Sequence, residues 1–218
     1  MNPAIRHIEP HTLETLLLVG ALVLIAVAKS SNESKFNSFI GLFLSYRFLK
    51  LYSKESSTVS DRFNLLLFLA QVVSFGLFFY CCLDYFDISI AYGPLMIIAF
   101  LMLFILFKTY LEKTIAAIFS ISSFAESYQF HKLTYRNLLA LIMLPFSAFY
   151  LYSELNDKFI ISGGIIAFIC LNILTLGLTL RNHQKSISRH VFYFILYLCA
   201  LEIAPYLILI KFLFLDKA

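Results

Sequence analysis

The segment "RFNLLLFLAQVVSFGLFFY", Arg62–Tyr80, decides how this chain folds, because no charged residue follows Arg62 within it. As an α-helix, a stretch of this length extends about 27 Å, close to the roughly 30 Å thickness of a bilayer's hydrocarbon core. Leu, Val and Phe make up 12 of its 19 residues and are spread along its whole length. The segment therefore predicts a helix that spans a membrane.

The rest of the chain has the same character. Of its 218 residues, 61% are hydrophobic and 14% are charged. An ordinary soluble domain is about half apolar and about a quarter charged, so this composition argues against a water-soluble fold. We expect one all-α integral membrane domain over residues 1–218, with the lipid bilayer as its main surroundings.

Six apolar stretches have about the length needed to cross the bilayer, and turn-forming residues separate several of them. They cover approximately residues 12–28, 63–83, 90–107, 137–152, 159–180 and 190–210. Ala26 and Ala28 are spaced like a signal-peptide cleavage site, but the preceding residues contain a single basic residue, Arg6. A signal peptide begins with a basic region, so we expect the first stretch to remain as a spanning helix.

Lys and Arg are distributed unequally between alternate connections of these six stretches. Thirteen of the 17 fall in the first, third and fifth connections, and four fall in the remaining connections and the tails. Basic loops stay in the cytoplasm, so both termini are predicted on the outer side. The basic cytoplasmic positions include Arg47, Lys50, Arg136, Arg181, Lys185 and Arg189.

Two further apolar segments lie within the predicted cytoplasmic connections, at about residues 36–52 and 112–130. The first is apolar enough for a seventh crossing, but it contains Arg47 and Lys50, and a crossing there would invert every later connection. In the second, Ile115, Ile118 and Tyr128 fall on one helical face. We predict that both are amphipathic helices lying at the membrane surface.

Glu202 is the residue most in need of a partner, because it lies near the middle of the last apolar stretch. Pro205 follows closely, and its missing N–H leaves the carbonyl of Leu201 without a helical hydrogen bond. Gln71 and Asn172 lie at similar counted depths, and Lys108 lies closer to the cytoplasm. These residues predict an intramembrane polar cluster, which can serve as a hydrogen bond between helices, a proton or cation site, or a docking point for a partner helix.

No enzyme or cofactor signature accompanies this cluster. The cysteines Cys81, Cys82, Cys170 and Cys199 lie in apolar runs without metal-ligand spacing, and the histidines lack the spacing of a zinc motif. We find no phosphate-binding glycine loop and no hydrolase or metalloprotease motif. The sequence therefore predicts no catalytic residue, no metal, no cofactor and no nucleic-acid partner.

Three segments carry a resemblance to a known family: "LEK" at Leu111–Lys113, "FHKLTYRN" at Phe130–Asn137, and "FYFILYLCALEIAPYLILIK" at Phe192–Lys211. Together they resemble a family of polytopic inner-membrane proteins of Bacteroidota that is known as a domain of unknown function. The resemblance covers most of the chain. It implies a location in a bacterial inner membrane and no established activity.

Two kinds of function fit these observations. The first is a non-enzymatic subunit or assembly factor that binds another membrane protein, which fits the short outer loops and the missing catalytic groups. The second is a small proton- or ion-coupled carrier that uses Glu202 with Gln71 and Asn172. The carrier hypothesis draws on a weak internal similarity, since residues 62–80 and 135–152 both open with Arg, Asn and a Leu pair.

Overall fold

The computed structural model describes residues 12–41, 62–86, 93–118, 122–153 and 156–182. These residues form α-helices and no strand, which confirms the predicted all-α class. The helices are α1 (Thr12–Ser31), α2 (Glu33–Ile40), α4 (Arg62–Tyr85), α5 (Pro94–Ile118), α6 (Ser122–Tyr152) and α7 (Asp157–Asn182).

Local sequence explains where several helices begin. Asn32 caps α2, because its side-chain oxygen accepts a hydrogen bond of 3.0 Å from the backbone N–H of Lys35. Pro94 opens α5, where a missing N–H costs nothing. The Asn156 side chain accepts from the backbone N–H of Lys158 at 3.1 Å just before α7. Pro145 lies inside α6, which nevertheless continues to Tyr152.

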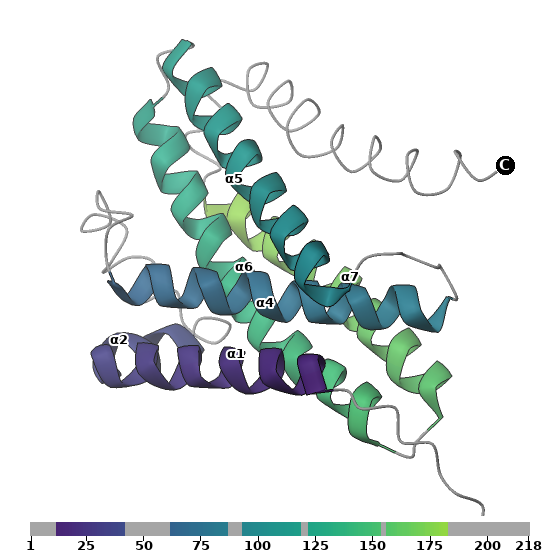
Figure 1. Ribbon diagram of the computed structural model, residues 1–218. Coiled ribbons are helices and arrows are strands. Elements are labelled where there is room, and N and C mark those ends of the chain that lie inside the picture. The colour runs from purple at the N-terminus through teal and green to yellow at the C-terminus, as the bar shows by residue number, and fades with distance from the viewer. Residues whose placement is uncertain (1–11, 42–61, 87–92, 119–121, 154–155, 183–218) are drawn as a thin grey trace, which may run out of the picture.

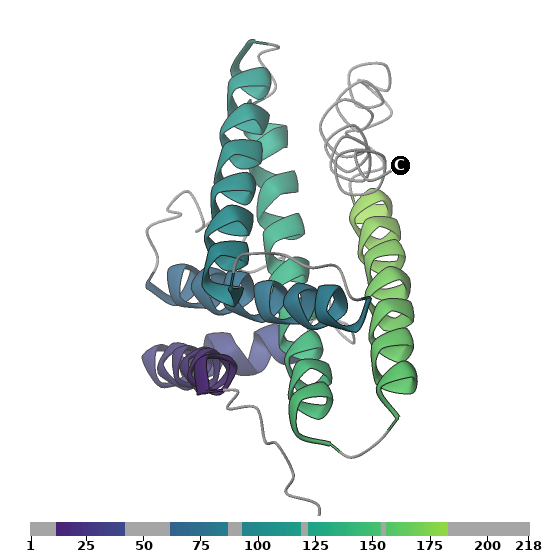
Figure 2. The same ribbon diagram turned by 45° about the vertical axis from the view of Figure 1, so that its right-hand side comes forward.

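The helices form two groups that cross each other. α1 and α4 lie side by side, and α5, α6 and α7 run across them in both views (Figures 1 and 2). α1 packs antiparallel to α4, since Ala28 clusters with Phe63 and Leu67 while Ala21 clusters with Leu77. α4 and α6 run in the same general direction, and α7 returns antiparallel to α6.

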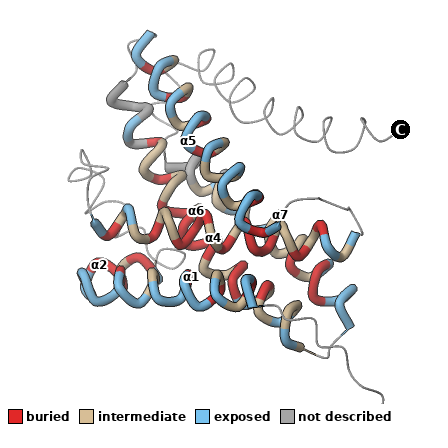
Figure 3. Tube along the Cα trace, in the orientation of Figure 1, coloured by how far each residue is buried: buried red, intermediate tan, exposed pale blue. Residues whose placement is uncertain are grey.

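The core lies where α4 crosses α6, and the buried positions concentrate on these two helices (Figure 3). Leu77, Leu139 and Met143 are almost completely buried there. The outward faces of α1, α5 and α7 instead expose large apolar side chains. Such faces suit a lipid environment, in which apolar exposure carries no cost.

Within the described residues, four helices are long and apolar enough to cross a membrane: α1, α4, α5 and residues Asp157–Thr175 of α7. The sequence had predicted six crossings. The expected crossing at 137–152 is the second half of α6, whose apolar part extends about 22 Å and is shorter than a typical hydrocarbon core. The expected crossing at 190–210 lies outside the described residues.

The predicted surface helix at 112–130 is not a separate element. Residues up to Ile118 continue α5, and residues from Ser122 begin α6. Helix propagation is cooperative, and no Pro or Gly interrupts the chain where the crossing was expected to end. α5 therefore ends, and α6 begins, within the range of the predicted surface helix.

The predicted surface helix at 36–52 is described only as far as Gly41. Within this part, Phe36 and Phe39 of α2 are buried in a cluster with Phe63 of α4 and Tyr135 of α6. Here they pack against protein, because α2 follows α1 after a single residue and turns back toward α4 and α6.

The closest approach of α4 to α5 occurs at Gly76. A Cβ atom there would lie 2.3 Å from Cγ1 and 3.2 Å from the Cα of Ile98. We expect Gly76→Ala to lower the free energy of unfolding by about 1–3 kcal/mol, because α5 has to move outward. The measurement is denaturant unfolding of the detergent-solubilised protein.

Gly20→Ala is the matched control, because a Cβ at Gly20 meets nothing within 4 Å. Adding Ile98→Ala to Gly76→Ala should recover part of the lost stability by removing the clashing Cγ1. Equal stabilities of Gly76→Ala and Gly20→Ala would show that the two helices do not approach this closely.

Candidate functional site

A buried polar contact joins α4 to α6. Gln71 is 1% exposed and Asn137 is 3% exposed. In the amide orientation that satisfies both ends of Gln71, its Nε2 donates to Asn137 Oδ1 at 2.6 Å. Its Oε1 accepts from Arg136 Nε at 2.9 Å and from Arg136 Nη2 at 3.3 Å. The Gln71 amide therefore holds two consecutive residues of α6.

One turn further along, the same two helices share a second hydrogen bond. Ser74 Oγ donates to the carbonyl oxygen of Ala140 at 2.6 Å, and both residues are buried. Gln71 and Ser74 are three residues apart on α4, so they lie on the same face of the helix. The crossing of α4 and α6 is thus fixed by polar contacts as well as by packing.

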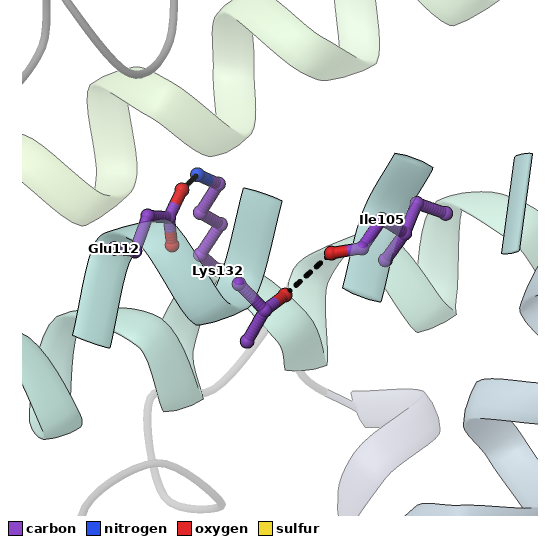
Figure 4. Close-up of polar contacts among 4 residues, drawn as sticks. Ile105, Glu112 and Lys132 are labelled. Atoms are coloured by element: carbon purple, nitrogen blue, oxygen red, sulfur yellow. Dashed lines mark hydrogen bonds and ion pairs between the residues drawn. The ribbon is translucent and has the colours of Figure 1, made fainter. Parts of the chain in front are cut away.

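α5 and α6 meet through an ion pair. Glu112 Oε1 lies 2.8 Å from Lys132 Nζ, and the Glu112 side chain is 4% exposed (Figure 4). Lys108, one turn before Glu112, is also buried. Thr109, between them, donates to the carbonyl of Ile105 at 2.8 Å within its own helix. Glu112, rather than this hydroxyl, therefore reaches α6.

These two sets of contacts are neighbours, because Arg136 follows Lys132 by one turn on the same face of α6. We call the combined set the three-helix polar site. It consists of Gln71 from α4, Lys108 and Glu112 from α5, and Lys132, Arg136 and Asn137 from α6.

A separate group of polar contacts ties together the opposite ends of α1, α4 and α6. Tyr150 donates to Asp84 Oδ2 at 2.9 Å, and Tyr80 is hydrogen-bonded to Glu14. The hydroxyls of Thr15 and Tyr152 are also hydrogen-bonded to each other. This end carries carboxylates, whereas the three-helix polar site is predominantly cationic.

The predicted polar cluster of Gln71, Asn172 and Glu202 is described only in part. Gln71 lies in the three-helix polar site, bonded to Asn137 and Arg136. Asn172 Nδ2 donates to the carbonyl of Phe168 at 2.8 Å, within its own helix. Glu202 and Pro205 lie outside the described residues, so their part of the cluster stays a prediction.

The predicted basic positions also differ in their placement. Arg136 was expected in a cytoplasmic connection, but it lies inside α6 with its guanidinium against Gln71. Arg181 lies in the last turn of α7. The other four, Arg47, Lys50, Lys185 and Arg189, lie outside the described residues.

Sequence reasoning missed Glu112, Lys132 and Asn137 as members of the site, although a signal for Glu112 was present. The buried residues of α5 include Ile97, Ile105, Lys108, Glu112 and Ala116. Both charged residues thus continue the apolar stripe that faces the protein. Charges at stripe positions indicate a buried polar contact rather than a solvated helix face.

This arrangement offers hydrogen-bond donors and positive charge, and it lacks the features of a metal centre. Among the described residues, no three His, Cys, Asp or Glu side chains gather as metal ligands would. The described cysteines, Cys81, Cys82 and Cys170, are free thiols. The contacts of the three-helix polar site join α4 and α5 to α6.

The contacts of Gln71 predict a stability difference between two intramembrane amides. We expect Gln71→Leu to lower the free energy of unfolding by about 1–3 kcal/mol, because Asn137 and Arg136 lose a buried partner. Asn172→Leu should change it by less than about 0.5 kcal/mol, because that amide bonds only its own helix. Denaturant unfolding in detergent checks both, and equal losses would place the two amides in one cluster.

Comparisons with known proteins give one match. No curated protein and no solved structure matches this chain. The protein-family comparison matches residues 15–213, which include all of the three-helix polar site. The chain therefore belongs to the family described as Domain of unknown function (DUF4271).

Proposed function

We propose that this multi-span membrane protein is a non-enzymatic subunit or assembly factor that binds another membrane protein. The polar side chains of the described core support this proposal, because they bond one another across helices. Gln71 joins α4 to α6, and Glu112 with Lys132 joins α5 to α6. Such contacts stabilise a scaffold.

The uncovered face of α7 is the observation that carries the proposal. Phe159, Ile166, Ile169 and Ile173 are all exposed, at intervals of seven, three and four residues. Ser162 is exposed on the same face. Intervals of three and four are those of a helix that packs along another helix, and the exposed face of α5 has them as well at Phe100, Leu103 and Phe107. Ser162 distinguishes α7, because a small polar residue permits close approach in a membrane. The proposed occupant is a transmembrane helix of the partner.

A carrier is the second candidate, and the burial of Lys108 favours it. Ionisable side chains within a membrane span are rare and often mark a pathway for ions or protons. Lys108 lies on α5 within such a span and is 5% exposed. In this alternative, Glu202 of the last apolar stretch takes part with Gln71 in moving the coupled ion.

The proposed location is a bacterial inner membrane with both termini on the periplasmic side, as the family resemblance to Bacteroidota proteins and the loop charges favour. The positions of Lys108 and Lys132 on the side of the bundle opposite to Asp84 support this orientation, because basic residues collect on the cytoplasmic side.

Native purification tests the proposed function. We expect the C-terminally tagged chain, extracted in mild detergent, to retain a membrane-protein partner at fixed stoichiometry in native mass spectrometry. The double variant Ile166→Ala and Ile173→Ala should reduce that partner about tenfold, because it removes two side chains from the proposed contact. Glu202→Gln is measured beside it as a test of a docking role for this residue.

The control is the double variant Phe100→Ala and Leu103→Ala on the exposed face of α5, which should retain the partner. A well-folded chain without a partner in every sample would overturn the subunit proposal. Loss of proton-coupled uptake in Glu202→Gln, with folding intact, would then support the carrier.

The orientation gives a separate prediction for two exposed lysines. Lys113 lies near the end of α5 and Lys158 near the start of α7. In spheroplasts, a membrane-impermeant maleimide should label Lys158→Cys at once and Lys113→Cys only after permeabilisation. The reverse pattern would invert the topology, and labelling of the parent chain controls for its four cysteines, Cys81, Cys82, Cys170 and Cys199.

A further inference from the structure

The outer face of α5 carries a regular row of large exposed side chains (Figure 3). We call this row the α5 seam, and each of its members is more than half exposed: Phe100, Leu103, Phe107 and Tyr110. Their intervals of three, four and three residues are those of a helix that packs along another helix. Tyr110 adds one hydroxyl group to an otherwise apolar row.

The chain itself contains a segment with matching spacing. The family match continues to residue 213, so the predicted crossing at 190–210, outside the described residues, belongs to the same domain as the described helices. Residues of that crossing repeat the intervals three, four and three, at Cys199, Glu202, Tyr206 and Leu209. Residues at these intervals share one face of a helix. α6 continues through Pro145, so Pro205 is compatible with a helix over this segment.

The described helices determine the direction in which this segment has to run. Glu112, near the end of α5, contacts Lys132, near the start of α6. Gly164, in the first half of α7, approaches Phe146, near the end of α6. α5 and α7 therefore end at the same end of the bundle. The chain leaves α7 there at Asn182, so a crossing that follows runs back antiparallel to α5.

The connection after α7 is long enough to reach α5. α5 and α7 both pack against α4 and α6. Packed helices are about 8–10 Å apart, so two helices that share a neighbour lie within about 20 Å of each other. The connection at 183–189 spans up to about 24 Å when it is extended. The predicted crossing can therefore begin beside the end of α5.

Glu202 and the hydroxyl of Tyr110 fall at a similar depth in this arrangement. Tyr110 lies about 12 Å before the end of α5 at Ile118, and Glu202 lies about 18 Å after His190, counted at 1.5 Å per residue. Helical side chains lean toward the start of their own helix. The Tyr110 side chain therefore leans deeper into the membrane, and the Glu202 side chain leans back toward His190, which reduces the difference.

Tyr110 is also a more suitable partner for Glu202 than the two amides at comparable depth. Gln71 is bonded at both ends to residues of α6. Asn172 donates to the carbonyl of Phe168 in its own helix. Tyr110 instead exposes its side chain on the outer face of α5. A carboxyl group inside a membrane requires a hydrogen-bonding partner, and a phenol hydroxyl can donate to it.

We propose that residues 190–210 form a helix that packs antiparallel along the α5 seam, and that the Tyr110 hydroxyl donates a hydrogen bond to the Glu202 carboxyl. The pairing places Leu103 level with Tyr206 and Phe107 level with Glu202. It makes Glu202 a hydrogen-bonding group between two helices of one chain. The contact does not depend on a protein partner, and it leaves the exposed face of α7 uncovered.

Disulfide formation in membranes tests the contact in the full chain. The four native cysteines are replaced by alanine, and Leu103→Cys is combined with Tyr206→Cys. We expect an intramolecular disulfide on mild oxidation, measured by peptide mass spectrometry after free thiols are blocked. The matched control combines Leu103→Cys with Ile208→Cys, two residues further along and on the opposite side of the helix. It should give at least about fivefold less disulfide, because the bond requires Cα atoms within about 7 Å.

Three results overturn the contact. Equal disulfide yields in the test pair and the control show that the segment does not face the α5 seam. A disulfide between Ile166→Cys and Tyr206→Cys, with none to Leu103→Cys, places the segment on α7. A disulfide that joins two chains on a non-reducing gel shows that a second copy covers the seam.

Thermal unfolding in detergent tests the hydrogen bond independently, in the chain with its native cysteines. We expect Tyr110→Phe to lower the unfolding temperature by about 2–4 °C, the effect of one lost hydrogen bond in a chain of this length. The same substitution should have little effect once Glu202→Leu has removed the acceptor. Glu202→Gln keeps an acceptor oxygen, so Tyr110→Phe should still lower the unfolding temperature in that background.

Equal effects of Tyr110→Phe in the parent chain and in Glu202→Leu overturn the hydrogen bond. Loss of the partner in the α7 variant, or a lone chain in the partner experiment, leaves both measurements unaffected. The intramolecular contact and the proposed subunit role therefore fail separately.

Discussion

The amide of Gln71 has to be satisfied within the protein, and the arrangement of the central helices follows from that requirement. In an apolar environment, an unpaired amide costs several kcal/mol, because no water can replace its partner. Arg136 and Asn137 of α6 bind both ends of this amide. Ser74 and Ala140 repeat the contact one turn later. α4 can therefore neither rotate nor slide along α6 without breaking several buried hydrogen bonds.

The remaining helices attach to this fixed crossing in different ways. α1 packs along α4 through small and branched apolar side chains such as Ala21 and Leu77. α5 approaches α4 closely at Gly76 and reaches α6 through Glu112 and Lys132. Lipid supplies no hydrophobic force between helices, so close approach and polar contacts have to supply the specificity. Both occur where the described helices meet.

The sequence predicts the membrane environment and most of the helices because these depend on local composition. The bounds of α1, α4 and α7 lie within a few residues of the predicted stretches. α5 extends further than predicted and ends at Ile118. The turn between α5 and α6 was misplaced, since the amphipathic pattern continues through both of its flanks. Periodicity reports which face is apolar, but it does not report where a helix stops when no Pro or Gly marks the end.

The polar site was less predictable, because it depends on which helices become neighbours. Counted depth placed Gln71 and Asn172 at one level, but depth carries no information about the direction in which a side chain points. Asn172 bonds its own helix, and the partners of Gln71 come from α6. The apolar stripe of α5 did contain the information that Glu112 faces inward. Its pairing with Lys132 requires that the two residues belong to different, antiparallel helices, whereas the sequence places both near one predicted surface helix at 112–130.

The continuity of α6 has a mechanical consequence. Its 31 residues extend about 46 Å, and the same rod carries Lys132 and Arg136 toward one end and Tyr150 toward the other. A tilt of this rod about the Gln71 contact would displace its two ends in opposite directions, as a lever moves about its pivot. Pro145 lies between that pivot and Tyr150, where the helix lacks one backbone hydrogen bond. The stiffness of the helical turn at Pro145 therefore determines how far a movement of α6 at Lys132 is transmitted to the contact between Tyr150 and Asp84.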